Sequence, residues 1–522
     1  MHGRSVFFRS ALATVAVSCC ISFSACFEGA VLNPSPNTFH VAPHGDDAND
    51  GSSSFPWRTI QHAANVLRAG ETAYVHEGEY RERVQINVSG SPALGSVTFV
   101  AYPGDRPTLD GRNLPLPVDN AAMLLIEDHS HVIVDGFEIR NDYASQGNQF
   151  PSGILILGAS SEIVIRNCII HHIGNNRPAI HGDGPFAHGI AVYGTRAPQA
   201  ARAIRIEGNE LHHLETGGSE ALVVNGNVDG FEILDNYIHH VNNIAIDCIG
   251  YEGTSPDDAF DRARHGIVRG NRIEDASGVG NRFYSDPYGA LGIYIDGAFD
   301  VVVERNMILR TDFGLEIASE HPERTAQAIR VHSNVIAESR TVGLSIGGWI
   351  EDWGGASDVV IVNNTFYRND ALRAGHGEVA LLRHLSDIRL FNNLIVAREQ
   401  GGFLLNEATT GDAVRVDFNL YVSSGGTADA LWIWNGVEYT TFHAYREASG
   451  NDRHSLVARP LFEDDSDGRF LLRRGSPGID AGDNAAIRPF GPLDIAGRPR
   501  IVDGDGDGRP IVDLGAYETP TR

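Results

Sequence analysis

Apolar and polar residues alternate in short segments along most of the chain. Residues 292–317, GIYIDGAFDVVVERNMILRTDFGLEI, begin and end with the same pattern: a small residue, then apolar and variable positions in turn. The apolar positions of these two segments share one face: Ile293, Ile295, Leu315 and Ile317. Alternation with a period of two predicts strands that bury one face, and no helical periodicity competes with it here.

A second pattern is an asparagine followed two positions later by an apolar residue. It recurs at Asn167, Asn209, Asn236, Asn271, Asn306, Asn334, Asn364, Asn393 and Asn419. The intervals are 42, 27, 35, 35, 28, 30, 29 and 26 residues, which indicates one repeated turn with loops inserted in some copies. An asparagine side chain satisfies the backbone groups of a turn and stacks on the asparagine of the next coil.

These patterns predict an all-β fold, a right-handed parallel β-helix over residues 39–425, since parallel crossovers are right-handed by default. A helix from about Thr59 to Gly70 is expected to cap its N-terminal end, because Ile60, Ala63 and Ala64 have amphipathic spacing. Residues 426–522 lose the repeat and are predicted to form a C-terminal cap.

The first 26 residues resemble an export signal. Arg4 and Arg9 precede an apolar run that ends at Phe23-Ser24-Ala25-Cys26, which is similar to a bacterial lipoprotein cleavage box. We therefore expect Cys26 to carry lipid and to anchor the chain in the cell envelope, with residues 27–38 as a linker. The departure is Phe23, where such boxes usually have leucine, and the alternative is cleavage nearby and a secreted product.

Three stretches together resemble a known family: GDDANDG…FPWRTIQHA…EGEYRE near the N-terminus, the asparagine repeats, and RGSPGIDAGD…VDLGAYE near the C-terminus. They resemble right-handed parallel β-helix repeat proteins of the pectin-lyase-like superfamily over nearly the whole mature chain. The resemblance implies a secreted or surface-anchored bacterial protein. It does not select a reaction, because the fold hosts lyases, glycoside hydrolases, epimerases, tailspikes and adhesins.

The charge balance bears on the partner. The 41 fixed positive side chains are all arginine, and 67 acidic residues give a net charge of −26. An acidic chain is a poor nucleic-acid binder, and its acidity does not by itself identify a substrate. We expect a carbohydrate partner, contact with a membrane only through the lipid, and a monomer. Outside the signal only Cys168 and Cys248 remain, and they make no disulfide framework.

Carboxylates gather on the outward positions of the middle strands. In strand alignment, the first outward position reads Leu155, Ala191, Val223, Asp247, Tyr294, Glu316 and Ser345, and the second reads Leu157, Tyr193, Asn225, Ile249, Asp296, Ala318 and Gly347. The Cα atoms of Asp296 and Glu316 are then roughly 8 Å apart, and those of Asp247 and Glu316 roughly 10 Å. Glycosidases space their carboxyl groups at about 5 to 9.5 Å. The alternative is an ordinary charged surface.

Long insertions flank the same coils, at residues 250–265, 276–291, 318–328 and 347–358. Inserted loops of a solenoid usually build its binding face, and aromatic rings stack on sugars. The candidate substrate-binding residues, on these loops and on the strands, are Asn225, Tyr251, Glu252, Tyr288, Tyr294, Glu320, His321, Trp349 and Trp353.

Two further groups of residues suggest metals. Asp503, Asp505 and Asp507 alternate with glycine, and with Asp513 they predict a structural Ca²⁺, the alternative being a plain acidic turn. Histidine pairs follow three successive asparagines, at 171–172, 212–213 and 239–240, and we interpret them as a stacked turn column rather than a transition-metal site.

Three functions are consistent with these residues. The favoured one is a glycoside hydrolase with Asp296 as nucleophile or base, Glu316 as acid and Asp247 tuning both. The second is a Ca²⁺-dependent lyase acting on uronates. Superfamily members often use lysine or arginine as the base, and because lysine is missing, the base would be Arg269, Arg310 or His265. The third is a non-catalytic glycan-binding envelope protein.

Overall fold

The structure is a computed structural model that describes residues 37–118, 121–178, 184–284, 286–399, 401–406, 413–425, 430–464 and 468–521. The signal, Cys26 and nearly all of the linker lie outside these residues, so the lipid anchor stays a prediction. In the described part of the chain no helix has both the length and the apolar character needed to cross a membrane.

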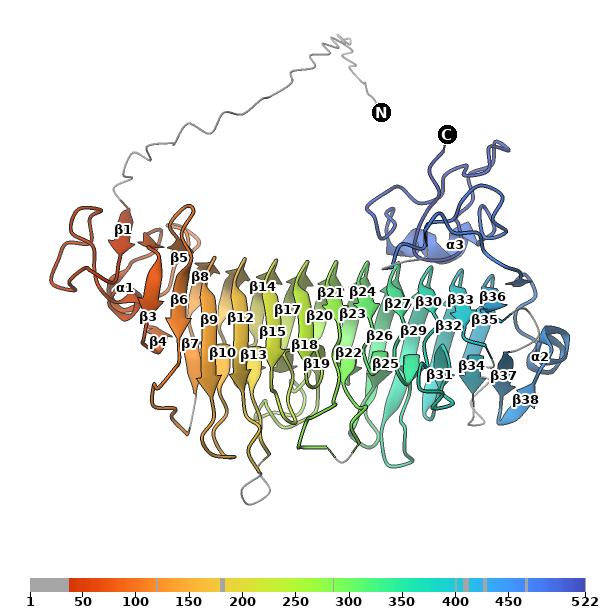
Figure 1. Cartoon of the computed structure of the whole chain (residues 1–522), viewed down its shortest axis with the longest axis horizontal. Helices are drawn as coiled ribbons and strands as arrows, with labels where there is room; N and C mark the ends of the chain where they lie inside the picture. The colour runs from red at the N-terminus through yellow and green to blue at the C-terminus, as the bar shows by residue number, and fades with distance from the viewer. Residues whose placement is uncertain are drawn as a thin grey trace, which may run out of the picture. The chain divides into compact units, whose positions relative to one another are not determined.

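Each coil places one strand in each of three sheets, and strands of successive coils pair in parallel (Figure 1). The described residues form three 13-stranded sheets, which is the all-β, parallel β-helix that the sequence predicted. Pairing continues past Gly425, the predicted end of the helix, because β37 joins the second sheet and β39 joins the third.

In spatial order, the first sheet contains β1 (Thr38–Val41), β2 (Thr72–Val75), β5 (Val97–Ala101), β8 (Ser130–Asp135), β11 (Ser161–Arg166), β14 (Ala201–Glu207), β17 (Val228–Leu234), β20 (Arg264–Arg269), β23 (Phe299–Glu304), β26 (Thr325–His332), β29 (Gly355–Val362), β32 (Leu385–Phe391) and β35 (Val414–Asp417). The second contains β4 (Val84–Ile86), β7 (Ala122–Glu127), β10 (Ser152–Leu157), β13 (His188–Gly194), β16 (Leu222–Gly226), β19 (Ile246–Ile249), β22 (Leu291–Asp296), β25 (Phe313–Ala318), β28 (Val342–Ile346), β31 (Val379–Leu381), β34 (Gly402–Asn406), β37 (Leu431–Trp434) and β38 (Val437–Tyr439). The third contains β3 (Gly78–Tyr80), β6 (Pro107–Asp110), β9 (Glu138–Tyr143), β12 (Ile169–Gly174), β15 (Glu210–Leu214), β18 (Tyr237–Val241), β21 (Arg272–Glu274), β24 (Met307–Leu309), β27 (Val335–Ala337), β30 (Thr365–Tyr367), β33 (Leu394–Ala397), β36 (Leu420–Ser423) and β39 (Leu456–Val457).

The inward positions of the strands form one continuous core. Ile293, Ile295, Leu315 and Ile317 are fully buried in it, as is Cys248. The period-two alternation therefore predicted the buried face correctly, and each coil covers the apolar residues of its neighbours.

The asparagines form a buried ladder along the core, which we call the asparagine ladder: Asn209, Asn236, Asn271, Asn306, Asn334, Asn364, Asn393 and Asn419. Each Nδ2 up to Asn393 donates to Oδ1 of the next asparagine at 2.9–3.1 Å. The assignment of Asn167 to this series was wrong by one position. Asn167 is exposed with φ 54°, and the backbone N of Cys168 is the group that donates to Asn209 Oδ1.

Three short helices and a 3-10 turn complete the described structure. Helix α1 (Ile60–Val66) buries Ile60, Ala63 and Ala64 and lies at the N-terminal end of the sheets, where a capping helix was expected (Figure 1). Helices α2 (Phe442–Ser449) and α3 (Asn484–Ile487) and η2 (Arg488–Phe490) follow the last coils.

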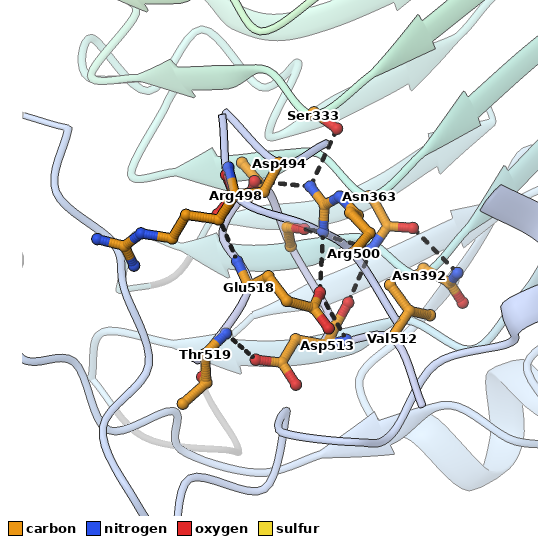
Figure 2. Close-up of polar contacts among 12 residues, drawn as sticks. Ser333, Asn363, Asn392, Asp494, Arg498, Arg500, Val512, Asp513, Glu518 and Thr519 are labelled. Carbon is orange, nitrogen blue, oxygen red and sulfur yellow. Dashed lines mark hydrogen bonds and ion pairs between the residues drawn. The ribbon is translucent and has the colours of Figure 1, made fainter. Parts of the chain in front are cut away.

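The C-terminal segment folds back onto the outside of the coils and is held there by buried polar contacts (Figure 2). Arg500 donates to the hydroxyl of Ser333 at 3.0 Å and to two carbonyls of its own segment. Asn363 donates to the carbonyl of Asp513 at 2.7 Å. The bonds to Ser333 and from Asn363 join residues more than a hundred positions apart, so the segment is part of the fold.

Candidate active site

The outward column of the second sheet follows the predicted alignment. Val223 pairs with Asp247, Asp247 with Tyr294, Tyr294 with Glu316, and Glu316 with Ser345. Asp296 lies two residues after Tyr294 on β22, and it pairs with Ala318, two residues after Glu316 on β25. The register therefore gives the carboxylates the spacing expected from the sequence.

These carboxylates are buried, which was not expected. Asp247 and Asp296 are each 2% exposed and Glu316 is 4% exposed, although all three lie outside the apolar core. The prediction that they face solvent was wrong because strand parity only excludes a side chain from the core. It does not say whether another part of the chain covers it.

The loops beside β19, β22, β25 and β28 bring polar groups to this column. The indole of Trp349 donates to Glu316 Oε1 at 3.0 Å. The backbone N of Glu320 donates to Asp296 Oδ1 at 3.0 Å. Glu252, from the loop after β19, accepts a 2.7 Å hydrogen bond from Asn225 Nδ2. We call the group of Glu220, Asp247, Glu252, Asp296, Glu316 and Glu320 the carboxylate cluster.

Burial and mutual repulsion change the acidity of the cluster. Burial, with the charges of Glu220 and Asp296, raises the pKa of Asp247 well above its usual range. Burial also raises the pKa of Asp296, and the negative charge of Glu320 adds to this effect. Burial raises the pKa of Glu316 to about 8, opposed by the hydrogen bond from Trp349. Burial and the charge of Glu252 raise the pKa of Glu220 to about 8.

The cluster is neither neutralised nor fully hydrogen-bonded. Among the described residues, no arginine forms an ion pair with any of its members, and His188 lies 3.6 Å from Glu220. Three buried side-chain oxygens, those of Asp247 Oδ1, Tyr294 OH and Asn225 Oδ1, have no hydrogen-bond partner in the described structure. Unpaired buried polar groups are costly to folding, and they cluster where a ligand completes the bonding.

An aromatic pocket of about 270 Å³ is connected to the cluster through His188. Its wall includes Phe150, Phe186, Leu155 and Tyr193, and also His188, which lies 3.6 Å from Glu220. The hydroxyl of Tyr193 lies 3.1 Å from His188 Nε2, on the side opposite the contact of His188 Nδ1 with Glu220. The arrangement joins an apolar aromatic surface to a set of carboxyl groups.

Four predicted substrate-binding residues form no hydrogen bond or ion pair with the carboxylate cluster among the described residues. Tyr251 stacks under the guanidinium groups of Arg262 and Arg324. Tyr288, His321 and Trp353 make backbone hydrogen bonds within their own loops. Their part in substrate binding stays a prediction.

Sequence reasoning missed Glu220, His188 and Tyr284. His188 lies at the start of β13 and Glu220 just before β16, where the alternation is not yet established, and Tyr284 lies in a long loop. Burial, with the charges of Glu220, Glu320 and Asp247, raises the pKa of Tyr284 to about 12. The signal in the sequence that could have indicated these residues was the position of the inserted loops beside the coils that carry the carboxylates.

The candidate calcium residues divide into two groups. Oxygen atoms of Asp503 and Asp505 lie within 4.8 Å of one another and of Asp480, a residue that the sequence pattern did not indicate. Asp507 instead accepts from the backbone of Arg509. Asp513 is buried and accepts from Asp480 N and Thr519 N. The oxygen donors of Asp480, Asp503 and Asp505 fit a hard cation, and calcium there stays a prediction.

Comparison with known proteins agrees with this fold. Residues 39–268 match the family model described as "Pel9A-like, right handed beta helix region". Fold and match together define the class as right-handed parallel β-helix proteins, which confirms the resemblance seen in the sequence.

Within that class, the chain belongs to the family of YwoF from Bacillus subtilis (strain 168), an uncharacterized protein. The two are 34% identical over 439 residues, which are 84% of this chain and 91% of YwoF. Pectate lyase PEL9 of Emericella nidulans is 30% identical over 125 residues, 23% of this chain and 30% of PEL9. The crystal structure of pectate lyase Pel9A has a TM-score of 0.43 and 14% identity, covering 92% of this chain and 96% of Pel9A, a likeness of fold alone.

Proposed function

We propose that the protein is a glycoside hydrolase that cleaves an oligosaccharide or polysaccharide with its carboxylate cluster. The observation that carries the proposal is the burial of several interacting carboxyl groups that no arginine of the described residues neutralises. Such an arrangement destabilises the folded protein, and it holds one carboxyl group protonated beside another that is ionised. Acid and base together are what glycosidic cleavage requires.

The roles follow from the hydrogen bonds. Glu316 is the acid, because its pKa of about 8 keeps it protonated at neutral pH, and the indole of Trp349 orients the carboxyl group through Oε1. Asp296 is the nucleophile or base, because the backbone N–H of Glu320 stabilises its ionised form against the burial and the charge of Glu320 that raise its pKa. Asp247 Oδ1 has no hydrogen-bond donor, so Asp247 keeps its proton more readily than Asp296 does and tunes the other two.

The pocket beside the cluster supports a carbohydrate substrate. Its aromatic wall, which includes Phe150, Phe186 and Tyr193, offers stacking surface for the C–H face of a sugar ring. A sugar chain bound there would extend past His188 and Glu220 toward Asp247, Asp296 and Glu316 on the following strands of the same sheet. The acidic surroundings favour a neutral glycan over a polyanion.

A uronate lyase is the second candidate, and the similarity to a protein named pectate lyase PEL9 favours it. The three candidate bases of such a lyase do not fit. Arg269 and His265 lie on β20 of the first sheet and pair with Glu304 and Asp229, and Arg310 follows β24 and pairs with Asp275. No set of three ligand atoms within 4.8 Å of one another occurs in the cluster among the described residues, which does not fit a preformed Ca²⁺ site.

Product analysis separates these functions. The purified protein is incubated with a panel of neutral glycans and of uronate-containing polysaccharides, and reducing ends and ultraviolet absorbance are followed together. New reducing ends without an unsaturated uronate are expected. Reducing ends together with ultraviolet absorbance would show that the protein is a lyase and not a hydrolase. Binding without any product would show a glycan-binding protein instead.

A further inference from the structure

Three histidine pairs form a continuous surface ladder on the third sheet, away from the carboxylate cluster on the second. His171 on β12 pairs in register with His212 on β15, and His212 with His239 on β18. These three rings stack with centroids 4.7 and 5.0 Å apart. The second rings of the pairs stack in the same way, His172 to His213 at 5.3 Å and His213 to His240 at 5.1 Å.

The backbone brings both rings of each pair to one side. Adjacent residues of a strand normally point to opposite faces. Here the second histidine of each pair has a left-handed conformation, with φ of 54°, 51° and 53° at His172, His213 and His240. The alternation is broken there, and the two Nδ1 atoms within a pair lie only 2.6, 2.8 and 2.7 Å apart.

The turn itself does not require histidine. The coil before the ladder has Arg140 and Asn141 in these two columns, and the coil after it has Glu274 and Asp275, with φ of 60° at Asn141 and 53° at Asp275. Residues of quite different chemistry therefore adopt the same conformation. Histidine at both positions of three successive coils needs a reason other than backbone geometry, which changes our interpretation from the sequence.

We propose that the histidine ladder, residues 171–172, 212–213 and 239–240, binds a divalent transition metal ion of the borderline class, Cu²⁺, Ni²⁺ or Zn²⁺. Ligating nitrogens of His171, His172 and His212 lie within 4.8 Å of one another. Two imidazole nitrogens on one ion at about 2.0–2.1 Å lie roughly 3 Å apart, close to the separation within each pair. Imidazole suits these three metals, and Cu²⁺ binds most tightly among them.

The surroundings orient the imidazoles for ligation. Carboxylates hold the outer nitrogens at both ends of the row: Glu138 lies 3.2 Å from His171 Nε2, and Glu210 lies 3.3 Å from His239 Nε2. A carboxylate on the far nitrogen fixes a ring for ligation through the near one.

Titration of the full-length protein with Cu²⁺, Ni²⁺ and Zn²⁺ salts, one at a time at pH 7.5 by calorimetry, tests the proposal. The central pair is removed in H212N/H213N. The matched control is H265N/H454N, which changes two exposed histidines that each pair with a single aspartate. We expect the central-pair variant to bind Cu²⁺ on the order of tenfold or more weakly, and the control to bind as wild type does.

Electron paramagnetic resonance of the Cu²⁺ complex supplies a readout that a merely structural role would not change. Hyperfine splitting by nitrogen ligands is expected in wild type and in the control, and its loss or reduction is expected in H212N/H213N. Far-ultraviolet circular dichroism checks that the variant is folded. Equal affinity and equal spectra for wild type and a folded H212N/H213N, or no binding by wild type, would overturn the proposal.

Discussion

Two rows of buried polar side chains run from coil to coil, and they differ in how far they are satisfied. In the asparagine ladder, Asn306 Nδ2 donates to Asn334 Oδ1 and to the carbonyl of Val268, and its Oδ1 accepts twice from Asn271. In the column of the carboxylate cluster, Asp247 Oδ1 and the hydroxyl of the neighbouring Tyr294 have no partner in the described structure. The asparagines, Asp247 and Tyr294 are all buried, so burial does not explain the difference.

The comparison separates polar groups that hold the fold together from groups held ready for a ligand. A completed network such as the ladder offsets the desolvation of each amide and specifies one register. An incompletely hydrogen-bonded set of like charges neither offsets its desolvation nor specifies a register. Such a set is therefore retained only where function requires it. Changes to one row or the other test this division.

The largest effect is expected on catalysis. Asp296→Asn and Glu316→Gln keep the shapes of the side chains and remove the acid and base functions, so each should lower glycan turnover on the order of 10²-fold or more. Steady-state rates on the glycan found by product analysis measure this. Folding should survive, because both substitutions remove repulsion within the cluster.

Asp300→Asn and Glu338→Gln are the controls for these two variants. Both residues are exposed, in left-handed turn positions outside the second sheet, and belong to neither row. Glycan turnover by the two control variants should match that of wild type. Undiminished turnover in Asp296→Asn and Glu316→Gln would show that the cluster takes no part in catalysis, and the distinction drawn between the cluster and the ladder would be wrong.

The ladder should show the opposite response. Asn306→Ala leaves the N and Nδ2 groups of Asn271 and the carbonyl of Val268 buried without their partners. At about 1–3 kcal/mol for each unsatisfied group, the free energy of unfolding should fall by roughly 3 kcal/mol or more. Denaturant unfolding measures it.

Asn65→Ala is the matched control for the ladder. Asn65 lies on α1, and its side chain accepts two exposed hydrogen bonds, from Gln61 and Asn87. A change within about 1 kcal/mol is expected there. If Asn306→Ala lowered the free energy of unfolding as little as Asn65→Ala does, the ladder would contribute little to stability, and the apolar core would be what holds the fold together.

Stability should also depend on pH through the cluster. Glu316 has an ordinary pKa of 4.5 when unfolded and about 8 when folded. Between these values the folded state holds more protons, so the free energy of unfolding falls as pH rises from about 5 to 8. A single such group contributes at most about 1.4 kcal/mol per pH unit.

Comparison of Glu316→Gln with wild type isolates this contribution. Histidines of lowered pKa, such as His212, act in the opposite direction, and the difference between the two proteins cancels them. The variant should gain stability relative to wild type as pH rises from 5 to 8. A difference that stays constant over that range would mean that Glu316 ionises normally.

The smallest effect is expected at the acidic turn near the C-terminus. The degree to which its side chains are hydrogen-bonded is intermediate between the asparagine ladder and the carboxylate cluster. The carboxylates of Asp480, Asp503 and Asp505 approach one another, yet each also accepts from a backbone N–H. Bound Ca²⁺ should raise the melting temperature by a few degrees relative to chelator, by mass action on the folded state. The gain should be absent in Asp503→Asn. Equal melting temperatures in wild type would indicate a plain turn.

Much of the fold was predictable from local repetition. The period of two located the buried face, and the asparagine intervals located the coils, because a solenoid repeats the same environment every coil. The same periodicity placed Asp247, Asp296 and Glu316 on one outward face. The displacement from Asn167 to Cys168 shows the limit, since Asn167 fits the pattern and only the hydrogen bond to Asn209 identifies Cys168 as the buried position.

What the tertiary structure alone decided is the chemistry of that face. The burial of Glu316, its bond to Trp349 and its proximity to Glu320 depend on loops that do not repeat, and so does the approach of Asp480 to Asp503. Strand parity is a local property of the backbone. Acidity and metal affinity depend on solvent exclusion and on charges brought together from distant positions, and a one-dimensional pattern does not contain those distances.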